Sequence, residues 1–181
     1  WFHVDAAYGG FFKLVNKLNS KFEGIEKADS ITLDPHKTLF LPFGTGTILI
    51  RNKEKLLKAF HYLADYMQDA IDADEEISPA DISPEQTKHF RGMRMWLPLK
   101  LFGLKPFRAS LEEKLYLTQY FYNEIKKIKG FEVGPEPELS VAIFRFVPTD
   151  RNADSFNKKL IKAIQKDGRI FLSSTKINGM F

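Results

Sequence analysis

Apolar positions in the first fifty residues follow two different periods. The stretches 1–8, 30–33 and 44–52 are short, largely apolar runs next to glycine or proline, and they predict three strands. Between the first two, residues 11–22 place apolar side chains at near-helical spacing, at Phe12, Val15, Leu18 and Phe22. This order of strand, helix and strand is typical of an α/β sheet.

Capping signals indicate where a helix begins in the middle of the chain. Ser83 is the predicted N-cap, Pro84 stands at the first helical position and Gln86 is the capping-box partner. We expect this helix to run to about Trp96, with Pro98 disturbing its last turns.

The last third of the chain has the pattern of a small α+β domain. A long helix is expected over residues 106–129, ended by Gly130. Residues 139–147 are typical of a strand, residues 153–168 of a helix, and residues 169–175 of another strand.

An acidic segment separates the two halves. From Asp65 to Glu85 there are eight acidic residues and no Lys or Arg, with two prolines inside, so we predict a mobile loop. The predicted domain organisation is therefore residues 1–64, the loop at 65–85, and connecting helices with the small domain at 86–181.

Composition excludes several classes of protein. The 181 residues carry a net charge of +4, but the basic residues are spread among acidic ones, so nucleic-acid binding is not expected. Cysteine is absent, which removes disulfides, cysteine-zinc clusters and thiol nucleophiles. No apolar run approaches the roughly 20 residues of a membrane helix, so we expect no membrane contact and a cytoplasmic location. We also expect no metal site. The chain opens on a strand without an initiator Met, and we suspect a piece of a longer polypeptide.

One acidic residue lies within the first predicted strand. Because side chains alternate along a strand, His3, Asp5 and Ala7 project from the same face. A carboxylate on an apolar strand needs a cation or hydrogen-bond donors, so Asp5 requires a partner. The alternative is a strand-end aspartate that caps the following turn.

A lysine follows the second predicted strand. Lys37 comes two residues after Pro35, which restricts the backbone and holds the lysine in position. A lysine in a partly desolvated site can form a Schiff base with a carbonyl compound. Taken alone, an ordinary surface lysine beside a turn is the commoner case.

The ordered set of motifs changes this balance. "HVDAAYGG" at 3–10 is followed by "DPHK" at 34–37, "FGTG" at 43–46, "FRGMRMW" at 90–96 and the run "PLKLFGLKPFRASLEEKLYLTQYFYNEI" at 98–125. This set resembles the pyridoxal-phosphate-dependent group II amino-acid decarboxylases, which include the aromatic-L-amino-acid, histidine and glutamate decarboxylases. The resemblance implies the end of a fold-type I, aspartate-aminotransferase-like large domain, followed by a truncated small α+β domain.

The resemblance also implies roles for the motif residues. Lys37 would form the internal aldimine with pyridoxal 5'-phosphate, Asp5 would pair with the pyridinium nitrogen, and Ala7 would pack on the ring. His36 and Asp34 would lie near the cofactor phosphate. Asp34 has an alternative, because animal aromatic decarboxylases carry Asn there and its side chain can instead bond the backbone of the turn.

Two further residues have both a site interpretation and a structural one. His3 shares the strand face of Asp5 and could lie near the site, or it could be a packed, hydrogen-bonded histidine. Arg91 matches an arginine of the family's "R-x-x-[KR]-x-W" helix and could meet a substrate carboxylate, or it could form a structural ion pair.

The implied activity is decarboxylation of an L-amino acid to the amine and CO2, through a quinonoid intermediate, in a homodimer. The family's proton donor is a tyrosine on a mobile loop, yet this chain has no Tyr between Tyr66 and Tyr116. Tyr66, His89 or a divergence toward aldehyde formation are the alternatives. The family's ring-stacking His and its phosphate-binding segment precede the motifs found here, so we expect the 181 residues alone to be inactive.

Two competing interpretations remain at this stage. One is another lyase with the same cofactor, since such enzymes also pair a "DA" strand with an "HK" turn. The other is a catalytically inactive homologue that keeps the fold and serves as a binding or assembly module.

Overall fold

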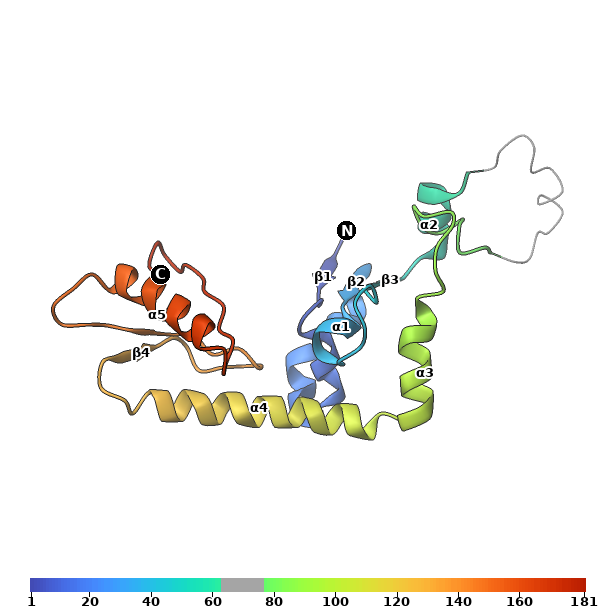
Figure 1. Ribbon diagram of the computed structural model, residues 1–181. Helices are drawn as coiled ribbons and strands as arrows, with labels where there is room; N and C mark the ends of the chain where they lie inside the picture. The colour runs from blue at the N-terminus through green and yellow to red at the C-terminus, as the bar shows by residue number, and fades with distance from the viewer. Residues whose placement is uncertain (63–76) are drawn as a thin grey trace. The chain divides into compact units, whose positions relative to one another are not determined.

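The computed structural model describes residues 1–62 and 77–181 (Figure 1). The chain divides into two compact units, Trp1–Leu111 and Glu112–Phe181. The boundary between the two units falls inside a helix. The domain limits predicted at residues 64 and 85 follow the organisation expected for a complete enzyme, and they stay a prediction. Residues 65–76 of the predicted acidic loop lie outside the described residues.

A three-stranded sheet forms the centre of the first unit. Its strands are β1 (His3–Asp5), β2 (Ser30–Leu33) and β3 (Thr47–Ile50). β2 lies in the middle, parallel to β1 and antiparallel to β3. The sequence therefore predicted all three strands, although β1 covers only three of the eight residues expected.

The segment between β1 and β2 is helical, but not as an α-helix. It forms the 3-10 helices η1 (Gly10–Leu14), η2 (Asn16–Phe22) and η3 (Ile25–Lys27). The prediction of one α-helix over 11–22 is wrong in type. The buried Val15 has an extended backbone (φ −91°, ψ 107°) between η1 and η2, so it interrupts the helical segment there.

Two short helices flank β3. The single-turn helix α1 (Pro35–Thr38) follows β2 directly, and α2 (Lys53–Phe60) follows β3. Asn52 caps α2, since its side-chain oxygen accepts the backbone N–H of Glu54 at 2.9 Å.

Helix α3 (Gly92–Phe102) begins later than its capping signals predict. The Ser83 hydroxyl donates to the Pro79 carbonyl at 2.8 Å instead of capping a helix, so the predicted start at residues 83–86 is wrong. Pro98 lies inside α3 rather than beyond it. Among the described residues, no helix has the length and apolarity needed to cross a bilayer.

The second unit contains most of α4 (Lys105–Ile125), the antiparallel pair β4 (Phe131–Val133) and β5 (Phe144–Phe146), and α5 (Ala153–Asp167). The long helix and α5 were predicted closely. The strand expected over 139–147 is shorter in the structure and comprises only β5. Its length matches that of its partner β4, which has three residues for pairing.

The segment expected to form a strand at 169–175 bends at residues 169–170 and has no regular secondary structure over 171–175. Phe171 is 81% exposed. The chain then turns sharply at residues 177–180, where Asn178 (φ 50°) and Gly179 (φ 80°) take the left-handed conformations of a type I′ turn. The pattern identified a strand-forming segment, but a strand needs a neighbour, and none is paired with it among the described residues.

Candidate active site around Lys37

The backbone of Ala7 connects the first two motifs. β1 ends at Asp5, whose Oδ1 accepts the backbone N–H of Ala7 at 3.1 Å. The carbonyl of Ala7 in turn accepts the backbone N–H of Asp34 at 3.1 Å. Residues separated by almost thirty positions in the sequence therefore meet at one end of the sheet, where β1 and β2 run parallel.

Lys37 lies on α1, immediately beyond this connection. Pro35 occupies the first helical position and is buried, and the Lys37 backbone N–H donates to the Asp34 carbonyl at 2.9 Å. The side-chain amine lies 2.8 Å from Asp34 Oδ2 and the side chain is 45% exposed. The structure thus holds the lysine backbone firmly and leaves its amine accessible.

Asp34 occupies a sheltered position between two segments. Its side chain is 16% exposed and makes no capping hydrogen bond to α1, so the turn-capping alternative is wrong. A Cβ on Gly46 would lie 3.2 Å from Asp34 Oδ1. Since that is tighter than ordinary van der Waals contact, the glycine of the "FGTG" motif leaves room for this carboxylate.

The His36 ring points into a partly apolar setting. Its centroid lies 5.5 Å from that of Phe43. Its Nδ1 is buried and has no hydrogen-bond partner within the described part of the chain, and the same holds for the Thr38 hydroxyl. Buried polar atoms without partners are rare, and both lie on α1 beside Lys37.

His3 takes part in a hydrogen-bonded group on β1 and β2. The Trp1 indole N–H donates to the Ser30 hydroxyl at 2.8 Å, and that hydroxyl lies 2.7 Å from His3 Nδ1. The other ring nitrogen, Nε2, lies 3.3 Å from the Thr32 hydroxyl. His3 is therefore hydrogen-bonded on both sides.

Arg91 pairs with Glu85 through both guanidinium nitrogens, at 2.5 and 3.2 Å. The hydrogen bond lowers the pKa of the Glu85 carboxyl and raises the pKa of Arg91. The structural alternative for Arg91 is thus the contact present here.

A second arginine was missed from the sequence. Arg94, on α3, donates to the carbonyl of Phe43 at 3.0 Å and so connects that helix to the "FGTG" motif. Only its place one helical turn after Arg91 could have indicated a role, because a contact across fifty-one residues leaves no local signal.

The donor set around Lys37 fits pyridoxal phosphate. An aldehyde needs an accessible primary amine, which Lys37 offers. A ring nitrogen needs a carboxylate oxygen, and Asp5 Oδ2 has no hydrogen-bond partner within residues 1–62 and 77–181. An unpartnered buried nitrogen on His36 supplies a further polar contact.

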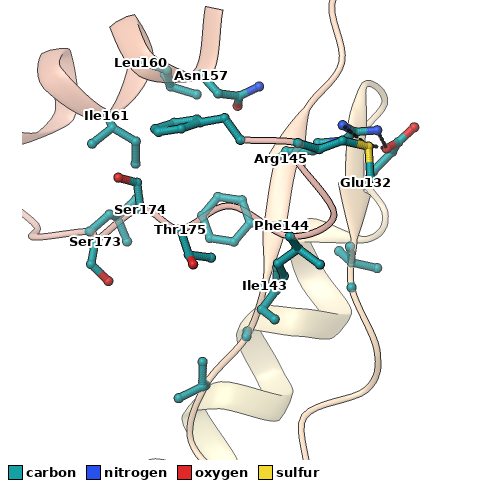
Figure 2. Close-up of a pocket in the computed structure, with 18 of the residues that line it drawn as sticks. Glu132, Ile143, Phe144, Arg145, Asn157, Leu160, Ile161, Ser173, Ser174 and Thr175 are labelled. Atoms are coloured by element: carbon teal, nitrogen blue, oxygen red, sulfur yellow. Dashed lines mark hydrogen bonds and ion pairs between the residues drawn. The ribbon is translucent and has the colours of Figure 1, made fainter. Parts of the chain in front are cut away.

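A separate cavity of about 360 Å³ lies in the second unit, between the β4–β5 pair, α5 and the C-terminal segment (Figure 2). Apolar side chains such as Ile143 and Ile161 line most of it. Figure 2 shows Glu132 and Arg145 paired at one side, at 2.7 Å. It contains none of the residues discussed around Lys37.

A comparison with models of protein families gives a match over most of the chain. The family model described as the pyridoxal-dependent decarboxylase conserved domain matches residues 1–147. An aromatic-L-amino-acid decarboxylase from Bacillus atrophaeus is 34% identical over 182 residues, covering 98% of this chain and 38% of the relative. The chain thus spans a little over a third of the length of that protein.

Solved structures agree with the fold. A crystal structure of Oryza sativa TDC with PLP and tryptamine superposes with a TM-score of 0.91 at 23% identity, over 99% of this chain and 38% of that one. Mouse CSAD in its apo form gives a TM-score of 0.82 at 27% identity, over 99% and 39% of the two chains. The predicted fold class, a fold-type I α/β architecture, is confirmed by these likenesses.

Proposed function

Because the chain belongs to the pyridoxal-dependent decarboxylase family, whose cofactor is pyridoxal phosphate, we propose that the complete protein decarboxylates an L-amino acid to the amine and CO2. The observation that carries this proposal is the connection through Ala7, which brings the acid of one motif and the lysine of the other to one end of the sheet. We propose aromatic amino acids as the substrate class, because the relative from Bacillus atrophaeus is named an aromatic-L-amino-acid decarboxylase.

Each residue of the site has a distinct task in this proposal. Lys37 holds the cofactor through its amine, and Asp5 faces the ring nitrogen and favours its protonated form. Ala7 offers a small side chain against the ring, and His36 contacts the phosphate. When bound, pyridoxal phosphate supplies the electron-accepting ring that stabilises the carbanion left by loss of CO2.

The protein's partners are part of the proposal. We infer a homodimer acting on a small amino-acid substrate in the cytoplasm, and Arg91 as a contact for the substrate carboxylate. For Arg91 this requires release from Glu85, and both side chains are exposed enough for such a rearrangement. His3 supports the site from the β1 strand, since its ring is held in place by Ser30 and Thr32.

Borohydride trapping tests the central residue. In the complete protein, reduction should attach the cofactor covalently to Lys37, as seen by peptide mass spectrometry, and Lys37→Ala should abolish the adduct. Lys127→Ala is the matched control, because Lys127 also pairs with an acid three residues away, at 2.6 Å, but lies in the second unit. Wild-type protein without an adduct on Lys37 would overturn the proposal.

A second candidate activity is aldehyde formation from the same amino acid. It is favoured by the absence of any Tyr between Tyr66 and Tyr116, where the expected proton donor would lie. Product analysis separates the two activities, since decarboxylation yields the amine and CO2, whereas the alternative consumes dioxygen and water and yields the aldehyde, CO2, ammonia and hydrogen peroxide.

A further inference from the structure

We propose that Asp34 is a positioning residue for Lys37, and that its carboxylate receives the lysine amine whenever this amine is not bonded to an aldehyde. The inference rests on the proposed function for its consequence in catalysis, but its geometry stands without the cofactor. It differs from the phosphate contact expected for Asp34 from the family resemblance.

The contact between the two side chains is direct. Asp34 Oδ2 lies 2.8 Å from the Lys37 amine, a normal length for a charge-assisted hydrogen bond. The two residues are three positions apart on either side of Pro35, and the Lys37 N–H bonded to the Asp34 carbonyl holds the same pair together through the backbone. The side chains therefore meet without ordering any additional segment.

Asp34 has no competing task among the described residues. An aspartate before a helix commonly caps it, but Asp34 makes no capping bond to α1. A Cβ added at Gly46 would lie 3.2 Å from Asp34 Oδ1, so a larger residue at position 46 would press on the carboxylate. The carboxylate is thus sheltered on one side by the "FGTG" motif and open to Lys37 on the other.

The two acids of the site are divided between different partners. Asp5 is occupied on one oxygen by the Ala7 N–H, and no ion pair joins it to a lysine within the described residues. The lysine amine lies against Asp34 instead. Asp5 therefore keeps an oxygen for a ring nitrogen, while Asp34 holds the amine.

The strength of the pair suits a reversible holding role. Because the Lys37 side chain is 45% exposed, solvent screens its attraction to the sheltered Asp34 carboxylate and keeps the pair weak. Such a pair keeps the amine in one place without preventing its departure. Any reaction that frees the Lys37 amine returns it to this carboxylate.

Reductive methylation of the protein without cofactor tests the contact. Formaldehyde and cyanoborohydride at one fixed pH modify amines in their neutral form, and a carboxylate partner favours the charged form. Asp34→Asn keeps the shape and removes the charge, so Lys37 should be labelled about 2- to 5-fold faster, the factor that corresponds to about 0.5–1 kcal/mol. Asp34→Glu, which restores the charge, should return the rate toward that of the wild type.

Lys127 serves as the internal reference in the same samples. Asp34→Asn should leave the labelling rate of Lys127 unchanged in the folded protein. If the whole protein unfolds, the labelling rates of both lysines rise. The ratio of the Lys37 rate to the Lys127 rate therefore isolates the local effect. A ratio that stays at the wild-type value, or falls, would overturn the inference.

This experiment separates the inference from the proposed function. Formaldehyde replaces the cofactor, so the ratio of labelling rates reports on Asp34 and Lys37 alone. Borohydride trapping of pyridoxal phosphate on Lys37 reports on the function. Either result can fail while the other succeeds.

Discussion

The carboxylate of Asp5 accepts the backbone N–H of Ala7 at the end of β1, at 3.1 Å. This hydrogen bond uses one carboxylate oxygen to shape the turn toward η1 and leaves the other unpartnered within the described residues. The same residue thus has a structural task and a proposed chemical one, and substitutions can separate them.

Asp5→Asn should affect cofactor binding far more than stability. The amide oxygen can still accept the Ala7 N–H, so the free energy of unfolding should change by less than about 0.5 kcal/mol. Loss of the charge should weaken pyridoxal phosphate binding about 10- to 100-fold, the usual worth of a charged hydrogen bond. Urea unfolding and a cofactor titration measure the two effects.

Asp29→Asn is the matched control for Asp5→Asn. Asp29 also accepts a backbone N–H, from Phe2 at 2.7 Å, and has no proposed cofactor contact. Its substitution should leave cofactor affinity unchanged. Equal losses of affinity in the two variants would contradict the role of Asp5.

Ser30→Ala should destabilise the protein by about 0.5–1.5 kcal/mol, because the buried hydroxyl and its hydrogen bonds to Trp1 and His3 are lost. The Ser30 hydroxyl accepts from Trp1 and lies against His3, and the residue is 3% exposed. Ser20→Ala, at an exposed position of η2, should change stability by less than about 0.5 kcal/mol. Equal unfolding midpoints in urea for the two variants would refute this prediction.

The Arg91 and Glu85 pair should be lost in acid. Because Arg91 lowers the pKa of the Glu85 carboxyl, the pair stabilises the folded state fully above the ordinary glutamate pKa of about 4.3. That contribution disappears as the pH falls further, through the lowered pKa of the folded state. In an NMR titration, Arg91→Gln should move the Glu85 midpoint up toward its ordinary value.

Arg151→Gln provides the comparison for Arg91→Gln. Arg151 lowers the pKa of Asp150 through the same kind of hydrogen bond, in the second unit. Its substitution should raise the Asp150 midpoint and leave that of Glu85 in place. If Arg91→Gln leaves the titration midpoint of Glu85 unchanged, the pair is absent in solution.

Asn157→Ala should cost about 2–4 kcal/mol of unfolding free energy. The buried Asn157 side chain accepts the Phe146 N–H and donates to the carbonyls of Phe146 and Ala153, so it ties β5 to α5. Asn152→Ala, which removes the α5 cap on the Ser155 N–H, should cost only about 1 kcal/mol. A smaller loss for Asn157→Ala than for Asn152→Ala, measured by urea unfolding, would contradict the prediction.

Local pattern was sufficient where an element needs only its own residues. Helix α5 follows the predicted range because its apolar spacing, its Asn152 cap and its terminal Gly168 all lie within the segment. The motifs "HVDAAYGG" and "DPHK" likewise carry Lys37, Asp5 and Ala7 in the sequence itself. Their roles stay predictions.

Local pattern failed where distant partners compete. Ser83 had every capping signal, yet its hydroxyl bonds the Pro79 carbonyl and Glu85 pairs with Arg91, so α3 begins at Gly92. The strand expected at 169–175 has the correct composition but no paired neighbour among the described residues.

The sequence by itself determined which chemical groups the protein carries and the approximate order of its elements, because residue identity and short-range periodicity are local properties. Only the tertiary structure decided which groups meet. It placed the Ala7 carbonyl on the Asp34 N–H and the Arg94 guanidinium on the Phe43 carbonyl. Such contacts depend on strand register and on backbone hydrogen bonds between segments far apart in the chain, and no single segment encodes them.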